Sequence, residues 1–249
     1  MTPMEKTLLL LGGTSDIGRA TAQRYAEAGW RILLAARDAE AAERNARDIA
    51  ARTGASVSVH PFDVLDADGF AAFIERLPAL PNTVVCVIGT LGEQSRAESE
   101  MAHATTILRT NFEGPALFLG LIAGRFAARE WGTIVGVSSV AGDRGRASNY
   151  VYGSAKAGFT AFLSGLRNRL ARDTQVRVVT VKPGFVRTRM TAGMKLPGPL
   201  TAEPAEVGRA IYRRAEERRA DVIYVRPVWR LVMAIIRAIP ERIFKRLSL

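Results

Sequence analysis

The sequence predicts a single α/β domain, a doubly wound parallel sheet of about seven strands with helices on both faces. Strand-length apolar runs alternate with alanine- and charge-rich stretches at helical spacing along most of the 249 residues. The strands are apolar almost throughout, which is typical of a parallel sheet covered on both faces. A hydrophobic content of 48% with no low-complexity segment indicates a folded chain with a sizeable core.

The elements follow in the order that this fold requires. Strands are expected over residues 7–11, 31–36, 56–60, 83–88, 133–138, 176–181 and 221–225. Helices are expected over residues 17–28, 39–53, 67–77, about 100–129, 151–171 and 203–219. Right-handed crossovers between such strands give the doubly wound arrangement. Residues 196–200 read as an irregular loop. We expect residues 1–226 to form the main domain and residues 227–249 a basic, amphipathic helical tail.

Composition excludes several classes of protein. The single cysteine, Cys86, lies in an apolar run and is expected in a buried strand, so neither a disulfide nor a metal site is predicted. The apolar run Leu8–Leu11 is too short for a signal peptide or a spanning helix, and a cytoplasmic location is expected.

The net charge of +11 is uneven, because residues 1–123 hold 11 basic and 15 acidic groups while the rest of the chain is strongly basic. An anionic membrane, a phosphorylated substrate or nucleic acid could each match this field, or it could reflect arginine-rich composition alone. No recognition motif supports nucleic acid, which is not expected.

A glycine-rich turn follows the first predicted strand and precedes the first helix. Glycines in this context let backbone amides approach a pyrophosphate at the helix N-terminus, as in Rossmann-like dinucleotide sites. The turn contains Gly12, Thr14, Ser15, Asp16, Ile17 and Gly18. We expect Asp16 to cap the helix and to point away from the phosphates.

Tyr152 and Lys156 lie at positions i and i+4 of a predicted helix, on one face. A phenol has an ordinary pKa of about 10, and lowering it to near 7 requires roughly 4 kcal/mol of phenolate stabilisation. A nearby ammonium can contribute to that. The pair therefore predicts a proton-transfer device.

Together these motifs resemble those of the short-chain dehydrogenase/reductase family, over residues 7–225. The resemblance implies hydride transfer between a nicotinamide and a carbonyl or alcohol carbon. Tyr152 would be the general acid/base, Ser139 its partner on the substrate oxygen, Lys156 the residue that lowers its pKa, and Asn111 a support for a proton-relaying water. Leu11 and Asp16 depart from the family's glycine motif, and the segment around Gly89 departs from its Asn-Asn-Ala-Gly motif.

The resemblance also implies the cofactor contacts. Ala36 stands where NAD enzymes place an acid and Arg37 follows, so NADP is favoured over NAD. Ser15 and Arg19 are candidates near the phosphates. The remaining implied contacts are Gly12, Thr14, Ile17 and Gly18 in the turn, Asp63 and Val64 at the adenine, Gly89, and Pro183, Gly184, Val186 and Thr188 around the nicotinamide, beside Tyr152 and Lys156.

Two loops near the predicted pocket are basic, which favours an anionic substrate unless these side chains meet NADP phosphates or solvent. Their cations are Arg144, Arg146, Arg187, Arg189 and Lys195. The tail places Arg230 and Arg237 on one helical face among apolar residues and is too short to span a bilayer. It can lie on an anionic membrane or pack in the core or an oligomer interface.

The opening turn and the tail show a weaker resemblance to the decaprenylphosphoryl 2-keto-pentose reductase subgroup, which implies a keto-sugar on a lipid-linked phosphate. A soluble ketone, a steroid or an acyl-carrier substrate is the alternative. A catalytically silent NADP-binding regulatory protein is a remote one. The family resemblance further implies a homodimer or homotetramer.

Overall fold

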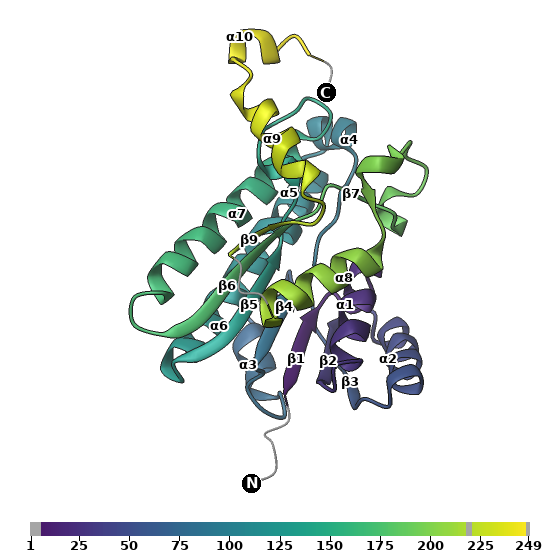
Figure 1. Ribbon diagram of the computed structural model, residues 1–249, viewed down its shortest axis with the longest axis vertical. Coiled ribbons are helices and arrows are strands. Elements are labelled where there is room, and N and C mark those ends of the chain that lie inside the picture. The colour runs from purple at the N-terminus through teal and green to yellow at the C-terminus, as the bar shows by residue number, and fades with distance from the viewer. Residues whose placement is uncertain (1–5, 218–220, 248–249) are drawn as a thin grey trace.

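The computed structural model describes residues 6–217 and 221–247, and it confirms the predicted fold class. Seven parallel strands form the central sheet in the order β3-β2-β1-β4-β5-β6-β9, with helices on both faces (Figure 1). The strands are β1 (Thr7–Leu11), β2 (Arg31–Ala36), β3 (Val57–Pro61), β4 (Thr83–Cys86), β5 (Trp131–Val137), β6 (Gln175–Lys182) and β9 (Val222–Tyr224). Two short strands, β7 (Phe185–Val186) and β8 (Thr201–Ala202), pair separately.

The helices lie close to the predicted ranges at most positions. They are α1 (Asp16–Ala26), α2 (Ala39–Thr53), α3 (Phe70–Glu75), α4 (Gln94–Ser99), α5 (Met101–Leu108), α6 (Gly114–Ala128), α7 (Tyr150–Leu170), α8 (Pro204–Tyr212), α9 (Val228–Ala238) and α10 (Glu241–Phe244). Short 3-10 turns occupy 140–142, 189–191 and 198–200, and π-helical turns occupy 109–113 and 213–217.

Two predicted helices are corrected by the structure. The helix expected over about 100–129 is divided into α5 and α6 by the π-helical turn Arg109–Glu113. The helix expected over 203–219 begins at Pro204 and passes into a π-helical turn over 213–217, while residues 218–219 lie outside the described residues. The helix α4 was not predicted.

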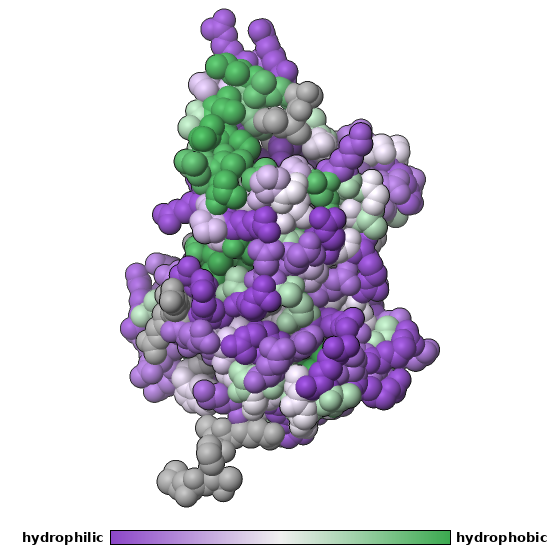
Figure 2. Space-filling model, turned by 45° about the vertical axis from the view of Figure 1, so that its right-hand side comes forward, coloured by the Kyte–Doolittle hydropathy of each residue, from purple (hydrophilic) through white to green (hydrophobic). Residues whose placement is uncertain are grey.

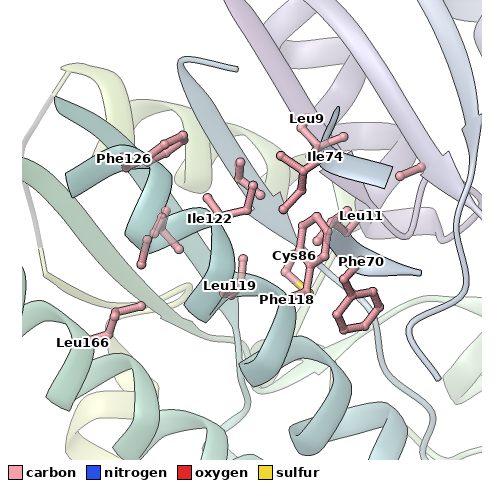
Figure 3. Close-up of a cluster of buried hydrophobic side chains, with 14 of the residues drawn as sticks. Leu9, Leu11, Phe70, Ile74, Cys86, Phe118, Leu119, Ile122, Phe126 and Leu166 are labelled. Atoms are coloured by element: carbon pink, nitrogen blue, oxygen red, sulfur yellow. The ribbon is translucent and has the colours of Figure 1, made fainter. Parts of the chain in front are cut away.

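The hydrophobic core lies on both faces of the sheet, and the register of the strands brings their carboxyl ends to one edge. In Figure 3, Phe118 of α6 lies beside Cys86, which is fully buried in β4 as predicted. The ring of Phe118 meets that of Phe70 edge-on at 5.3 Å between centroids. The register places Leu11 of β1 beside both Ala35 and Cys86, so these three strands end together at one edge. Ligand sites of doubly wound sheets lie at this edge.

The tail packs one face against the body of the protein. Trp229 and Met233 of α9 are buried, and the indole nitrogen of Trp229 donates to the carbonyl of Leu200 at 3.0 Å. A Cβ at Gly184 would lie 2.0 Å from the Trp229 ring, so this position accepts only glycine. No helix in residues 6–217 and 221–247 has the length and apolarity needed to cross a membrane.

The other face of the tail is exposed and apolar. Leu231 is 63% exposed and Ile235 58%, and Val228, Ile243 and Leu247 are also exposed. Figure 2 shows this apolar surface at the top of the molecule, where α9 and α10 lie. The tail thus packs one face against the body of the protein, as one of the two alternatives predicts, and leaves its other face uncovered.

Candidate active site

The turn between β1 and α1 is shaped by short local contacts. Gly12 has a φ of +95°, a conformation that favours glycine. The amides of Gly12 and Gly13 donate to the carbonyl of Ala35 at 2.9 and 3.1 Å. A Cβ at Gly18 would lie 2.4 Å from the carbonyl oxygen of Gly12, so Gly18 allows the helix to approach the turn.

The expectation that Asp16 caps α1 is wrong. Ser15 is the N-cap, and its hydroxyl accepts from the amide of Gly18 at 3.0 Å. Ser15 precedes the helix in extended backbone, where a hydroxyl reaches the free amides. Asp16 is the first helical residue and accepts from the amide of Arg189 at 2.8 Å. Its carboxylate is therefore engaged by the loop that follows β7.

A groove of about 730 Å³ lies over the ends of β1, β2 and β4. Six of the predicted cofactor residues line it: Gly12, Thr14, Ser15, Arg37, Val64 and Gly89. The guanidinium of Arg37 makes no hydrogen bond or ion pair with any described residue, which leaves it free for a phosphate. Asp63 does not line the groove, since its carboxylate accepts from the amide of Leu65 at 3.0 Å. Arg19 is paired with Asp48 at 2.9 Å instead.

The predicted acid/base residues meet at the carboxyl end of β5. Ser139 follows β5, and its hydroxyl lies near the phenol of Tyr152 on α7, where it favours the charged form of that phenol. Lys156, one turn further along α7, is 3% exposed, and its ammonium lies 5.9 Å from the centroid of the Tyr152 ring. The ammonium donates to the carbonyls of Val137 at 3.2 Å and Ile88 at 3.5 Å.

The electrostatics of this pair differ from the expectation. Desolvation raises the pKa of Tyr152, and the hydrogen bond from Ser139 opposes that rise. Lys156 is not among the groups that lower the pKa of Tyr152 here, and its ammonium donates to two carbonyls. Burial lowers the pKa of Lys156 to about 8. The charge on this lysine is therefore close to titrating at neutral pH.

Asn111 is fully buried within the π-helical turn. Its side-chain nitrogen donates to the carbonyls of Thr90 at 2.7 Å and Ile107 at 2.8 Å, and its oxygen accepts from the amide of Thr90 at 3.2 Å. A Cβ at Gly89 would lie 2.7 Å from the Asn111 oxygen and 3.2 Å from the Lys156 nitrogen. Gly89 therefore lets these two side chains converge at the groove, and π-helical turns are frequent at functional sites.

A smaller cavity of about 140 Å³ lies beside Tyr152. Ser139 and Tyr152 line it together with the predicted residues Ile17, Pro183, Gly184, Val186 and Thr188. Sequence reasoning missed Trp229, Met190 and Met194, which also line it. The available signal for Trp229 was a tryptophan two residues after Pro227, near the start of the tail.

Of the five basic residues expected around the pocket, three arginines pair with carboxylates and one arginine lines the cavity. Arg144 does not line the cavity, because its guanidinium donates to the carbonyls at the end of α9 and pairs with Glu241 at 2.8 Å. Arg187 pairs with Glu203 at 2.9 Å. Arg189 pairs with Asp16 at 3.3 Å and donates to the carbonyl of Thr14. Lys195 does not line the cavity, and Arg146 does.

Comparison with known proteins agrees with this geometry. The family model described as short chain dehydrogenase matches residues 6–196. An uncharacterized oxidoreductase of Streptomyces coelicolor is 38% identical over 246 residues, covering 97% of this chain and 96% of its own length. An uncharacterized oxidoreductase of Mycobacterium tuberculosis is 36% identical over 243 residues, covering 96% of each chain.

Among solved structures, a short-chain dehydrogenase from Sphingobium yanoikuyae in complex with NADPH has a TM-score of 0.80. It is 22% identical, and the match covers 95% of this chain and 97% of that one. The match to this solved structure shows a common fold. The matches to the family model and to the two relatives are matches of sequence. The chain belongs to the short-chain dehydrogenase family of oxidoreductases.

Proposed function

We propose that this oxidoreductase transfers a hydride between NADP(H) and a carbonyl or secondary alcohol carbon, with Tyr152 as general acid/base. The observation that carries the proposal is that the side chains of Ser139 and Tyr152 line one cavity beside the nucleotide groove. When bound, NADPH supplies the hydride to the substrate carbon. The chain's own residues bind the nucleotide, orient the substrate and move a proton at the phenol oxygen of Tyr152.

The residues around the groove fit a phosphorylated dinucleotide. The turn at Gly12, Thr14 and Ser15 presents its backbone to a pyrophosphate at the start of α1. Arg37 has an unpaired guanidinium for a 2′-phosphate, and Ala36 puts no carboxylate at the end of β2; the carboxylate of Asp38, which also lines the groove, accepts from the amide of Ala41 at 2.9 Å. The NADPH carried by the Sphingobium neighbour supports the same choice of NADP over NAD.

Each member of the central cluster has a separate task in the proposed reaction. Tyr152 donates its proton to the substrate oxygen during reduction and accepts one during oxidation. Ser139 donates a hydrogen bond to that oxygen and stabilises its developing charge. Lys156 places a positive charge 5.9 Å from the centroid of the Tyr152 ring. Asn111 fixes the segment at Thr90 and supports the proton path.

Replacing Tyr152 by phenylalanine tests the proposal. Loss of the proton donor should lower kcat/KM with NADPH and a panel of carbonyl compounds by at least about 10²-fold. The affinity for NADPH, measured by fluorescence titration, should change by less than about threefold. The matched control is Tyr150→Phe, because Tyr150 is exposed on the same helix. Unimpaired turnover by the Tyr152→Phe protein would contradict the proposal.

We further propose that residues 227–249 hold the protein at an anionic membrane, where a lipid-linked keto-sugar would be reached; a soluble ketone, steroid or acyl-carrier substrate is the alternative. The exposed apolar face of the tail supports this, since Arg230, Arg237, Arg242 and Lys245 surround it with positive charge. Trp229 and Met233 face the body of the protein at the same time. The tail therefore serves as a pocket wall and as a docking surface.

Flotation with anionic vesicles tests the docking face. Removing residues 227–249 would be uninformative, because Trp229 would be lost from the cavity. We therefore choose the double variant Leu231→Ser, Ile235→Ser, which changes only exposed side chains, with Met101→Ser on α5 as the control. The wild type and the control should float, and the double variant should not. If the double variant floats equally, or if the wild type stays in solution, the docking proposal is wrong.

A further inference from the structure

The cavity beside Tyr152 contains one charged side chain. Its described lining is formed by apolar residues, backbone, hydroxyls, the amide of Asn149 and the guanidinium of Arg146. No described carboxylate lines it. Such a cavity attracts negative charge to one point while its remaining walls favour apolar groups.

Arg146 lacks a partner within the described chain. Its Nε atom is buried without a hydrogen bond, and the guanidinium forms no ion pair. Burial alone lowers its pKa from the ordinary value. The other arginines of the two basic loops, Arg144, Arg187 and Arg189, each pair with a carboxylate. A half-buried cation without a partner costs free energy, which a ligand anion can offset.

The backbone presents Arg146 and Asn149 to the cavity together. The backbone N–H of Asn149 donates to the backbone carbonyl of Arg146 at 3.1 Å, which closes a turn directly before α7. The carbonyl of Asn149 then accepts from the amide of Gly153 at 2.8 Å and ties this turn to the helix of Tyr152. The side-chain oxygen of Asn149 is a second buried polar atom without a partner in the described residues.

We propose that this cavity selects carbonyl substrates that carry an anionic oxygen group, which the guanidinium of Arg146 binds. Carboxylate and phosphate oxygens fit the planar fork of arginine. The side chain of Asn149 accepts a hydrogen bond from a hydroxyl of the same substrate. Because Arg146 and Tyr152 line the same cavity, the anionic group and the reacting carbonyl belong to one substrate molecule. The inference rests on the proposed function, whose substrate it defines.

A binding experiment tests this without knowledge of the natural substrate. The NADPH-loaded protein is titrated with butyrate and with butyramide, which has nearly the same shape and no charge, using ligand-observed NMR. Loss of a charge-assisted hydrogen bond corresponds to about 10- to 100-fold in affinity. The wild type should therefore prefer butyrate by at least about tenfold, and Arg146→Gln should bind both equally. Arg146→Lys should retain part of the preference.

Control variants separate a binding role from a structural one. Arg187→Gln removes an arginine that is paired with Glu203 and should keep the butyrate preference. The Tm of Arg146→Gln should equal or exceed that of the wild type, because no described contact is lost. The inference is overturned if the wild type binds butyrate and butyramide equally, or if Arg146→Gln keeps the preference.

Two further arms complete the test. Farnesyl phosphate, a phosphate on an isoprenoid chain, is compared with propyl phosphate, and binding of either that is weakened in Arg146→Gln supports the anion site. A preference for the farnesyl compound identifies a lipid-linked source, and equal affinity identifies a free acid. Tyr152→Phe should keep the butyrate preference while losing turnover. Active Tyr152→Phe would overturn the proposed function alone, and a missing butyrate preference would overturn the anion site alone.

Discussion

At the scale of single residues, Lys156, near Tyr152, is an ammonium group that has been removed from water. Its ammonium is buried against two carbonyls, and its pKa is lowered from 10.5 to about 8. A shift of this size corresponds to about 3 kcal/mol. In the cofactor-free protein the charged ammonium therefore lowers the stability of the fold relative to the neutral amine. This cost indicates that Lys156 serves function and not stability.

This environment predicts an effect of pH on stability. Between pH 8 and 10.5 the unfolded chain holds a proton on Lys156 that the folded chain has released, so folding stability rises with pH in that window. Lys156→Met should therefore raise the Tm of the cofactor-free protein near pH 7, and the gain should shrink above pH 8. Turnover should be lost. Thermal unfolding of both proteins between pH 6 and 10 measures the difference, and a lower Tm for Lys156→Met at pH 7 would refute this account.

The free guanidinium of Arg37 predicts the coenzyme preference. Replacing Arg37 by serine should weaken NADPH binding by about 10- to 100-fold, because charge-assisted hydrogen bonds to the 2′-phosphate are lost. NADH binding should change little. Arg47→Ser, an exposed position on α2, is the control. Fluorescence titrations with both coenzymes give the comparison, and an equal loss of NADH affinity would argue against a 2′-phosphate contact.

Local spacing predicted Ser139, Tyr152 and Lys156 because a strand end and one helix place them together. It could not rank the five basic residues of the two loops. The partners that engage Arg144, Arg187 and Arg189 come from segments distant in sequence, so only the fold shows that Arg146 is left unpaired. The capping role given to Asp16 failed for a similar reason, since its partner is the amide of Arg189.

At the scale of elements, the close contact between Gly184 and α9 joins the tail to the pocket. A Cβ at Gly184 would meet the ring of Trp229 at 2.0 Å, so Gly184→Ala should displace α9, lower the Tm and reduce turnover. Limited proteolysis should then cleave the tail faster. Gly165→Ala is the matched control, because nothing lies within 4 Å of a Cβ in the middle of α7. It should stabilise that helix by about 0.5–1 kcal/mol. Equal Tm values for Gly184→Ala and the wild type would show that the contact is not needed.

Most strands were predictable because a buried parallel strand is an apolar run, and their ends lie within two residues of the expected ones. The π-helical turn was not predictable from helical periodicity. It arises where Asn111 must reach Thr90 on another segment, a contact of high sequence separation. The shorter helix α4 has few apolar residues and gives little periodic signal.

At the scale of the whole molecule, the outer surface of α6 carries exposed apolar side chains, and we propose that a second copy of this chain covers them. Leu117 and Leu121 are 49% and 45% exposed one turn apart, and Phe112 is exposed beside them. An apolar helix face of this kind suits a symmetric contact between subunits.

We therefore expect the wild type to be a dimer or tetramer in solution. The double variant Leu117→Glu, Leu121→Glu should lower the oligomeric state, because two like charges would face each other across the symmetry axis. Met101→Glu on α5 is the control. Size-exclusion chromatography with light scattering measures the mass. A variant that elutes at the wild-type mass would place the contact elsewhere.

The position of Trp229 has a consequence for how enzymes of this kind diverge. The family model ends at residue 196, yet one wall of the reaction cavity comes from residue 229. Mutations in the last twenty or so residues can thus reshape what the cavity admits while the nucleotide groove and the Tyr152 cluster stay unchanged. Selection can then tune substrate choice through the tail, which separates the evolution of specificity from that of the chemistry.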